Sequence, residues 1–140
     1  MKRLMGVLAA VALTGSACSG GSTTSPTLPP TASTPAVTDT WSGTVQVGGY
    51  DTHTLTAAAG SISITLTQAG PPATIFMGLG VGTPTDPTCT FFSGATTNTQ
   101  ASSSPQLTGT LSSSGPICVE VYDIGNQAAP VNYSVSVLHY

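Results

Sequence analysis

Positive charge is almost absent from this 140-residue chain, in which Lys2 and Arg3 are the only Lys or Arg side chains. Nucleic-acid affinity depends on neutralising phosphates with Lys and Arg, and attraction to anionic lipid depends on polybasic segments. Both kinds of partner are therefore excluded for everything that follows residue 3. An arginine clamp for a carboxylate or phosphate ligand is excluded for the same reason.

Negative charge is also scarce, with five acidic side chains. Their positions are Asp39, Asp51, Asp86, Glu120 and Asp123. Only the two histidines could pair with these carboxylates, so stability has to come from apolar burial, backbone hydrogen bonds and any disulfide.

The residues that catalysis would need are missing. No Gly-x-Ser-x-Gly motif is present, and the only histidines are His53 and His139. Asp51 and His53 are two residues apart, so we expect them to share an exposed strand face, and we expect His139 to be solvated. A zinc site needs three or four ligands, which two distant histidines do not supply. The sequence predicts a protein that is not an enzyme and has no cofactor.

Long apolar runs are absent as well. The longest, residues 4–13, has ten residues and follows Lys2 and Arg3. This is about half the roughly 20 residues of a membrane-spanning helix, but it fits the apolar region of an export signal. Residues 1–17 are predicted to be a signal peptide.

Cysteine is rare, and its placement is informative. Residues 13–18 (Leu-Thr-Gly-Ser-Ala-Cys) resemble the bacterial lipobox, with Gly15 where Leu is usual. An odd cysteine in an exported protein needs an explanation, and acylation of Cys18 supplies one. The alternative is conventional cleavage at the same bond. The resemblance implies a lipid-anchored cell-envelope protein, and Ser19 implies sorting to the outer membrane.

Residues 18–38 are predicted to be a disordered tether that begins at the acylated cysteine. After Cys18 the segment is uncharged and rich in Ser, Thr and Pro. It offers almost nothing to bury, so folding could not repay the ordering entropy.

Residues 39–140 show no helical period. They alternate apolar and polar residues in short runs separated by Gly, Pro, Ser and Asn, which predicts one all-β domain, an antiparallel, jelly-roll-like β-sandwich of about eight strands. The expected strands are 41–47, 50–57, 61–67, 74–81, 89–92, 107–111, 117–123 and 131–138. The turn at Gly48-Gly49 predicts a hairpin between the first two, and residues 93–104 are expected to form a mobile loop.

Alternation also assigns the faces of these strands. Trp41, Val45 and Val47 are expected on one face of the first strand. The residues expected to face inward on four of the later strands are Ile62, Ile64, Leu66, Ile75, Met77, Leu79, Val81, Ile117, Val119, Val121, Val131, Tyr133, Val135 and Val137. Gly78 and Gly80 lie opposite the core face of the fourth, which indicates a bulge or a close approach of another backbone. Cys118 is expected to point away from the core, where a disulfide to Cys89 would join neighbouring strands, or a strand to a loop, on the outside.

Several motifs resemble the bacterial pre-peptidase C-terminal domain, a β-sandwich appended to many secreted peptidases. They are Trp41-Ser42-Gly43-Thr44, Gly49-Tyr50-Asp51, residues 60–66, residues 115–123, and Tyr133 with Val135 and Val137. The resemblance spans most of residues 40–139. His53 and Leu55 replace the family's aromatic, and residues 74–77 replace its Asp-rich strand.

Ligand binding has two candidate forms. Exposed aromatic rings could stack on a carbohydrate, and the candidates carried forward are Trp41, Tyr50 and Tyr122. For Trp41 the favoured alternative is packing in the core or at a sheet edge, because it begins the alternating face, whereas Tyr122 shares the outward face with Cys118 and Glu120. A calcium ion needs six to eight oxygens, which Asp39, Asp86 and Asp123 could help to supply. We therefore expect an adhesion or binding module for a polysaccharide or an envelope protein, with a structural spacer, calcium-stabilised or not, as the alternative.

Overall fold

The computed structural model describes residues 34–140. The predicted signal peptide, Cys18 and most of the predicted tether lie outside the described residues. Eight strands follow one another along the chain: β1 (Val37–Val45), β2 (Tyr50–Ala57), β3 (Gly60–Gly70), β4 (Met77–Thr85), β5 (Thr88–Thr99), β6 (Leu107–Leu111), β7 (Gly115–Tyr122) and β8 (Val131–His139). The first strand begins two residues before the predicted domain boundary at Asp39.

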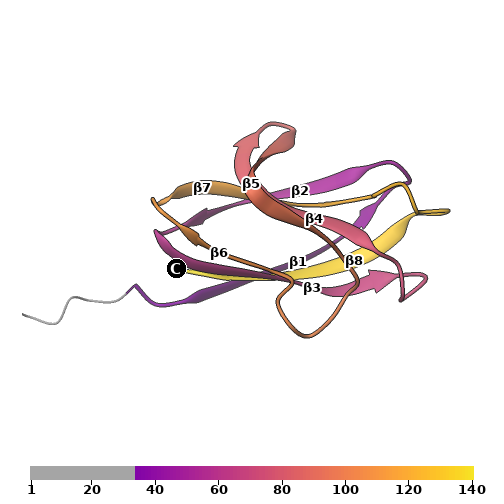
Figure 1. Cartoon of the computed structure of the whole chain (residues 1–140), viewed down its shortest axis with the longest axis horizontal. Coiled ribbons are helices and arrows are strands. Elements are labelled where there is room, and N and C mark those ends of the chain that lie inside the picture. The colour runs from indigo at the N-terminus through magenta and orange to yellow at the C-terminus, as the bar shows by residue number, and fades with distance from the viewer. Residues whose placement is uncertain (1–33) are drawn as a thin grey trace, which may run out of the picture. The chain divides into compact units, whose positions relative to one another are not determined.

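The strands form two antiparallel four-stranded sheets that lie face to face (Figure 1). One sheet has the order β1-β8-β3-β6, and the other has the order β2-β7-β4-β5. Only β4 and β5 are both consecutive and paired, so every other connection crosses from one sheet to the other. This is the strand order of a jelly roll, and the predicted all-β sandwich is confirmed.

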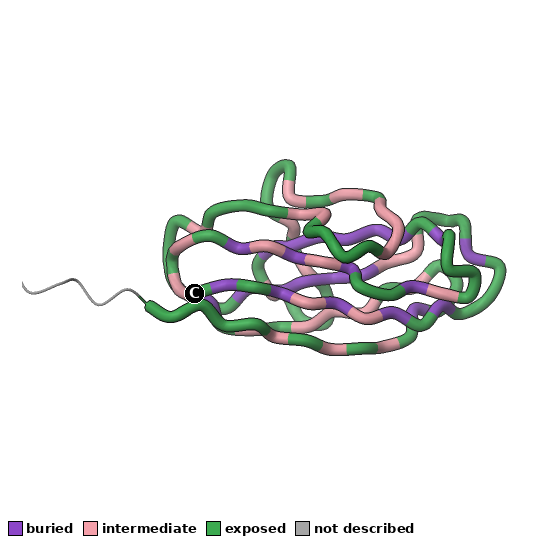
Figure 2. The backbone as a smooth tube through the Cα atoms, turned by 90° about the horizontal axis from the view of Figure 1, so that it is seen from below, coloured by how far each residue is buried: buried purple, intermediate pink, exposed green. Residues whose placement is uncertain are grey.

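The core lies between the sheets and is built by alternating residues of their inner faces. The buried segments in Figure 2 recur along the strands for this reason. The inward residues expected on β3, β4, β7 and β8 are buried. The core comprises Val45, Ala57, Ile62, Ile64, Leu66, Ala69, Ile75, Met77, Leu79, Val81, Ile117, Val119, Val121, Val131, Tyr133, Val135 and Val137.

The predicted hairpin between the first two strands is wrong. The turn itself forms, since the N–H of Gly49 donates to the carbonyl of Gln46 at 2.8 Å. However, β1 pairs with β8 and β2 pairs with β7, so the turn joins the two sheets instead of two paired strands. Val47 lies beyond the end of β1 and is 53% exposed, against the expected inward position.

The predicted mobile loop at 93–104 is also wrong for most of its length. Strand β5 continues to Thr99, where it pairs with Met77 of β4. It is an edge strand rich in Thr and exposed over much of its length, so little of it faces the core and no apolar alternation marks it. The register shifts between Gly80 and Gly82, where residues 92–95 bulge away from the ladder.

Candidate functional site

The outer face of the sheet β2-β7-β4-β5 brings two of the predicted ligand-binding residues together. Tyr50 of β2 lies directly opposite Tyr122 of β7, and Tyr122 lies opposite Gly78 of β4. Tyr50 is 46% exposed, and Tyr122 is half-buried. The two candidate tyrosines therefore form one surface feature.

Three glycines on the outer side of β4 make room for rings that lie against the sheet. A Cβ atom at Gly78 would lie 2.1 Å from a ring carbon of Tyr122, and one at Gly80 would lie 2.5 Å from a ring carbon of Phe91. A Cβ at Gly82 would lie 2.0 Å from the carbonyl oxygen of Thr90. The predicted bulge is present next to Gly80, but the close neighbours of Gly78 and Gly80 are side-chain rings, and another backbone approaches only at Gly82.

Phe91 of β5 adds a third ring to this face beside Tyr122. Its ring stacks on that of Tyr122, with centroids 5.8 Å apart and an angle of 28° between the planes. We call Tyr50, Tyr122 and Phe91, together with the polar residues Thr52 and Glu120 beside them, the aromatic face.

Glu120 is the charged group of this face, and its carboxylate is held in place. Its Oε2 accepts hydrogen bonds from Thr52 Oγ1 at 2.8 Å and from the N–H of Cys89 at 3.2 Å. The residue is 8% exposed. Sequence reasoning did not assign Glu120 or Thr52 to a site, although both share the outward parity of Tyr50 and Tyr122.

The Cys89–Cys118 disulfide forms, and it anchors β5 over this sheet. Strand β4 lies between β5 and β7, so the bond does not join neighbouring strands as expected. Strands two apart in a flat sheet are about 9–10 Å apart, whereas these Cα atoms are 5.8 Å apart. The first residues of β5 therefore fold over Gly82. They cover Cys118, which is completely buried even though its side chain points away from the core.

Trp41 lies away from the aromatic face, on an inward-facing position of β1. Its ring packs against His53 of β2, with centroids 4.6 Å apart, and its Nε1 is buried without a hydrogen-bond partner. The hypothesis of a Trp41 binding platform is wrong, because the ring fills the space between the sheets.

Trp41 belongs to what we call the inter-sheet network, formed with Asp51, His53 and Tyr133. The Tyr133 hydroxyl donates to Asp51 Oδ2 at 2.8 Å, and His53 Nε2 lies 2.9 Å from the same hydroxyl. The neutral His53 can therefore donate from Nε2 to the tyrosine oxygen. A Cβ at Gly43 would lie 2.3 Å from Asp51 Oδ2, so only glycine leaves room for this contact.

The surroundings of Tyr133 and His53 favour the uncharged form of each side chain. Burial raises the pKa of Tyr133 far above its usual value, and the Asp51 carboxylate adds to the shift. Burial lowers the pKa of His53, with Asp51 partly opposing the effect. A protonated phenol and a neutral imidazole connect β2 of one sheet to β8 of the other.

The calcium hypothesis fails because its three carboxylates do not converge. Among residues 34–140 no group of three or more His, Cys, Asp or Glu side chains could hold a metal ion. Asp39 Oδ2 instead lies 2.9 Å from Nε2 of His139. His139 is 4% exposed, whereas the sequence predicted that it would be solvated.

The part of the chain that the structure describes contains no helix long and apolar enough to cross a membrane.

Asp123 stabilises a turn. Its carboxylate accepts hydrogen bonds from the N–H groups of Gly48, Gly125, Asn126 and Gln127. Burial acts to raise its pKa, but the four donors outweigh that effect and lower it. This carboxylate joins the β1–β2 turn to the segment after β7.

Three neighbouring loops at this end of the sandwich carry exposed apolar side chains. The N–H of Asp123 donates to the carbonyl of Gly49 at 2.9 Å, and Asn126 Nδ2 donates to the carbonyl of Phe76 at 3.1 Å. The three loops are therefore neighbours, and they carry the exposed side chains of Val47, Phe76 and Ile124.

Neither a protein-family model nor a curated protein matches the sequence. Among solved structures, the chain is similar to PliG of Aeromonas hydrophila, a periplasmic lysozyme inhibitor of g-type lysozyme. The TM-score is 0.47 at 20% identity, with 74% of this chain and 88% of that chain covered. It is also similar to PliG of Salmonella Typhimurium, with a TM-score of 0.46 at 17% identity and coverage of 71% and 85%. No residue role is carried over from either.

Proposed function

We propose that this chain is a non-catalytic, lipid-anchored protein of the cell envelope whose β-sandwich binds a neutral polysaccharide on the aromatic face. The observation that carries the proposal is the convergence of Tyr50, Tyr122 and Phe91 from three strands onto one sheet face. The glycines of β4 keep that face flat beneath the rings. A flat surface of aromatic rings can accept the apolar face of a sugar ring.

The polar groups beside the rings match a sugar's hydroxyls. Thr52 and Glu120 are ordered by their mutual hydrogen bond, and Tyr side chains combine an apolar ring with a hydrogen-bonding tip. Ligand sites typically combine apolar surface with a few placed polar groups in this way. Jelly rolls include lectin domains, but the fold alone does not determine function, so the proposal depends on the face.

Charge selects a neutral ligand. No Lys or Arg follows residue 3, so the domain has no fixed cation to pair with sulfate, phosphate or carboxylate groups on a glycan. The Glu120 carboxylate on the aromatic face would repel an anionic chain at short range.

The anchor rests on the sequence of residues 1–18. A diacylated or triacylated Cys18 would hold the protein stably, because two or more acyl chains are needed for durable membrane attachment. Ser19 supports the outer membrane as its location. Mass spectrometry of the envelope-bound protein tests the modification, and Cys18→Ser should release the chain from the membrane fraction. Retention of the Cys18→Ser variant would contradict the proposal.

The likeness to the pre-peptidase C-terminal domain is part of the proposal. Its motifs supply Trp41, Gly43, Asp51 and Tyr133, and these four residues meet in the inter-sheet network. Because residues from separate motifs of the resemblance meet in one network, they supply the support in this structure for the proposed relationship.

The test of binding is the melting temperature of the exported chain carrying Cys18→Ser, measured with a panel of neutral and anionic polysaccharides. Calcium, a chelator and a g-type lysozyme complete the panel. A ligand at 100 times its dissociation constant adds about 2.7 kcal/mol, which shifts a domain of this size by several degrees. A neutral polysaccharide should raise the melting temperature, and calcium should not.

Two variants then locate the site. Tyr50→Ala and Tyr122→Ala should each weaken polysaccharide binding about tenfold, or ~1.4 kcal/mol. Tyr140→Ala removes an equally large ring that is 37% exposed but lies at the end of β8, and it should bind as the wild type does. A shift with lysozyme alone, or equal losses in all three variants, would contradict the proposal.

The opposite outer face supports the alternative of a structural spacer. On β1 and β8 it presents hydroxyl and amide side chains that bond to one another. Ser42 and Ser134 lie 2.7 Å apart, and Thr44 Oγ1 donates to Asn132 Oδ1 at 2.7 Å. Because these groups satisfy each other, this face offers few free donors. No shift with any ligand in the panel would favour the spacer.

A further inference from the structure

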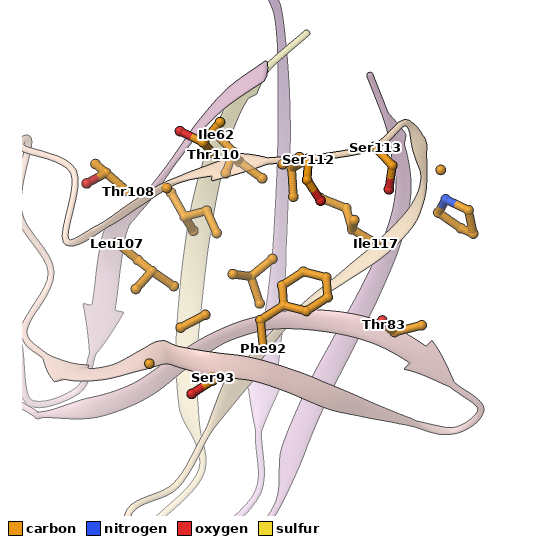
Figure 3. A pocket seen from close by; sticks show the side chains of 18 of the residues that line it. Ile62, Thr83, Phe92, Ser93, Leu107, Thr108, Thr110, Ser112, Ser113 and Ile117 are labelled. Carbon is orange, nitrogen blue, oxygen red and sulfur yellow. The ribbon is translucent and has the colours of Figure 1, made fainter. Parts of the chain in front are cut away.

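A cleft opens between the two sheets on the side where the edge strands β5 and β6 face each other (Figure 3). Its volume is about 540 Å³, which is within the range of small-molecule sites. None of the residues of the aromatic face or of the inter-sheet network lines it.

The floor of the cleft consists of core side chains from both sheets. Ile62 and Ile64 come from β3, Val81 comes from β4, and Ile117 comes from β7, with exposures from 0% to 5%. Leu107 and Leu111 of β6 form a half-buried wall. A ligand in the cleft would therefore contact the same apolar surface that stabilises the fold.

Phe92 lies at the mouth of the cleft. The bulge at residues 92–95 takes this residue out of the β4–β5 ladder, and its ring, 40% exposed, is directed into the cleft (Figure 3). A large ring left this exposed beside the core loses apolar burial that a ligand would restore.

The rim carries hydroxyl groups and no charge. Its polar side chains are Ser93, Thr83, Thr108, Thr110 and residues 112–114, and no ionisable side chain is among the lining residues. A charged ligand would find no partner at the floor, where burying an unpaired charge is costly. An uncharged apolar body with a hydroxyl-bearing end matches both the floor and the rim.

The shape of the cleft favours a chain over a compact ring system. It follows β6 from Leu107 to Leu111, a length of about 13 Å at the rise of a β-strand. Gly109 lies at the midpoint and faces the same side as Leu107 and Leu111. A Cβ there would meet only Ile62 Cγ2, at 3.9 Å, so the wall is open where a chain would pass.

We propose that this cleft binds the acyl chain of an uncharged single-chain lipid of the monoacylglycerol class. The acyl chain lies along β6 over the floor, the Phe92 ring covers it, and the glycerol hydroxyls meet the Ser and Thr rim. This site is separate from the polysaccharide face and stands on different residues.

The test measures binding of N-phenyl-1-naphthylamine, an uncharged fluorescent apolar probe, to the exported chain carrying Cys18→Ser in detergent-free buffer. We expect saturable binding and displacement by a monoacylglycerol used below its micelle concentration. Absence of saturable binding, or a bound probe that the monoacylglycerol does not displace, would overturn the proposal.

A variant that fills the cleft without unfolding the protein locates the site. Gly109→Leu should reduce affinity for the monoacylglycerol at least tenfold while the melting temperature stays the same or rises, because the new side chain occupies apolar space. Ser61→Leu adds the same side chain to the outer face of the neighbouring strand and should bind as the wild type does. Wild-type binding by Gly109→Leu, or an equal loss in Ser61→Leu, would contradict the site.

Chain length supplies a second readout. Each methylene that enters the cleft should raise affinity by up to about fourfold, the equivalent of ~0.8 kcal/mol per buried CH₂, until the cleft is full. A series of saturated monoacylglycerols should therefore show a rise and then a plateau. Affinity independent of chain length would overturn binding through the acyl chain.

Discussion

The glycines of β4 determine how the aromatic face can form. At Gly78, Gly80 and Gly82, a Cβ atom would collide with Tyr122, Phe91 and the Thr90 backbone. Each glycine therefore holds open a space that a neighbouring strand fills. The same positions in a strand that packed only against the core could carry any small side chain.

Replacing Gly78 tests this packing. Gly78→Ala should lower the free energy of unfolding by about 1–3 kcal/mol, because the Tyr122 ring must move away from the sheet. Gly115→Ala is the matched control in β7, since a Cβ there meets nothing within 4 Å, and it should change stability by less than about 0.5 kcal/mol. Urea unfolding measures both, and an equal effect of the two substitutions would contradict the account.

His53 gives the inter-sheet network a pH dependence. Its pKa in the folded state is lowered, whereas in the unfolded chain it is about 6.5. Below pH 6.5 the unfolded chain therefore binds more protons than the folded one, so stability is fully present above pH 6.5 and falls as the pH drops toward the folded pKa.

We expect the melting temperature to fall between pH 7 and pH 5, with Asp51 and Tyr133 as the groups that face the imidazole. His53→Gln keeps a donor for the Tyr133 oxygen but does not titrate, so its melting temperature should fall less over the same interval. Parallel curves for wild type and variant would show that His53 is not the source.

At the scale of the elements, alternation located most strands but not their partners. Ile62, Ile64 and Leu66 were correctly expected to be inward, because a strand with one buried face shows its period in the sequence. Pairing is a non-local property, and the Gly48-Gly49 turn indicated a hairpin that the long-range pairing of β1 with β8 overrides.

The aromatic face also combines features that the local sequence predicted with features that depend on strand pairing. Outward parity identified Tyr122 as a surface candidate, and Gly78 and Gly80 indicated a close neighbour. The adjacency of Tyr50 and Tyr122 depends on the β2–β7 register, which no local pattern reveals. For Trp41 the sequence left packing and binding open, because an aromatic ring between two sheets and one on a surface leave the same sequence pattern, and the structure shows packing.

The disulfide is the clearest prediction at this scale. It closes a loop with a sequence separation of 29 residues, for which chain entropy gives about 3–4 kcal/mol. The double substitution Cys89→Ala and Cys118→Ala should lower the free energy of unfolding by about 2–4 kcal/mol. Amide hydrogen exchange should also accelerate first in residues 88–91, the first residues of β5, which fold over Gly82.

A uniform rise in exchange across both sheets, with β5 no faster than the core strands, would contradict the role of the bond as an anchor of β5. The Tyr50→Ala variant, which leaves both cysteines in place, is the control for nonspecific effects on the aromatic face.

At the scale of the whole molecule, the two outer faces differ in kind. One carries rings from three strands with a fixed carboxylate, and the other carries hydroxyl groups that bond among themselves. With no Lys or Arg after residue 3, neither face can recruit an anion by charge. The asymmetry of the faces supports the proposal that one of them binds a neutral ligand, and the cleft between β5 and β6 lies apart from the aromatic face.

The most direct test of the aromatic face is an NMR titration of the exported chain carrying Cys18→Ser with the neutral polysaccharide that most raises its melting temperature. We predict that the largest amide shifts fall at Tyr50, Thr52, Phe91, Glu120 and Tyr122, with residues 132–136 of β8 unchanged. Shifts centred on β8 and β1, or on the lining of the cleft, would contradict the assignment of polysaccharide binding to the aromatic face.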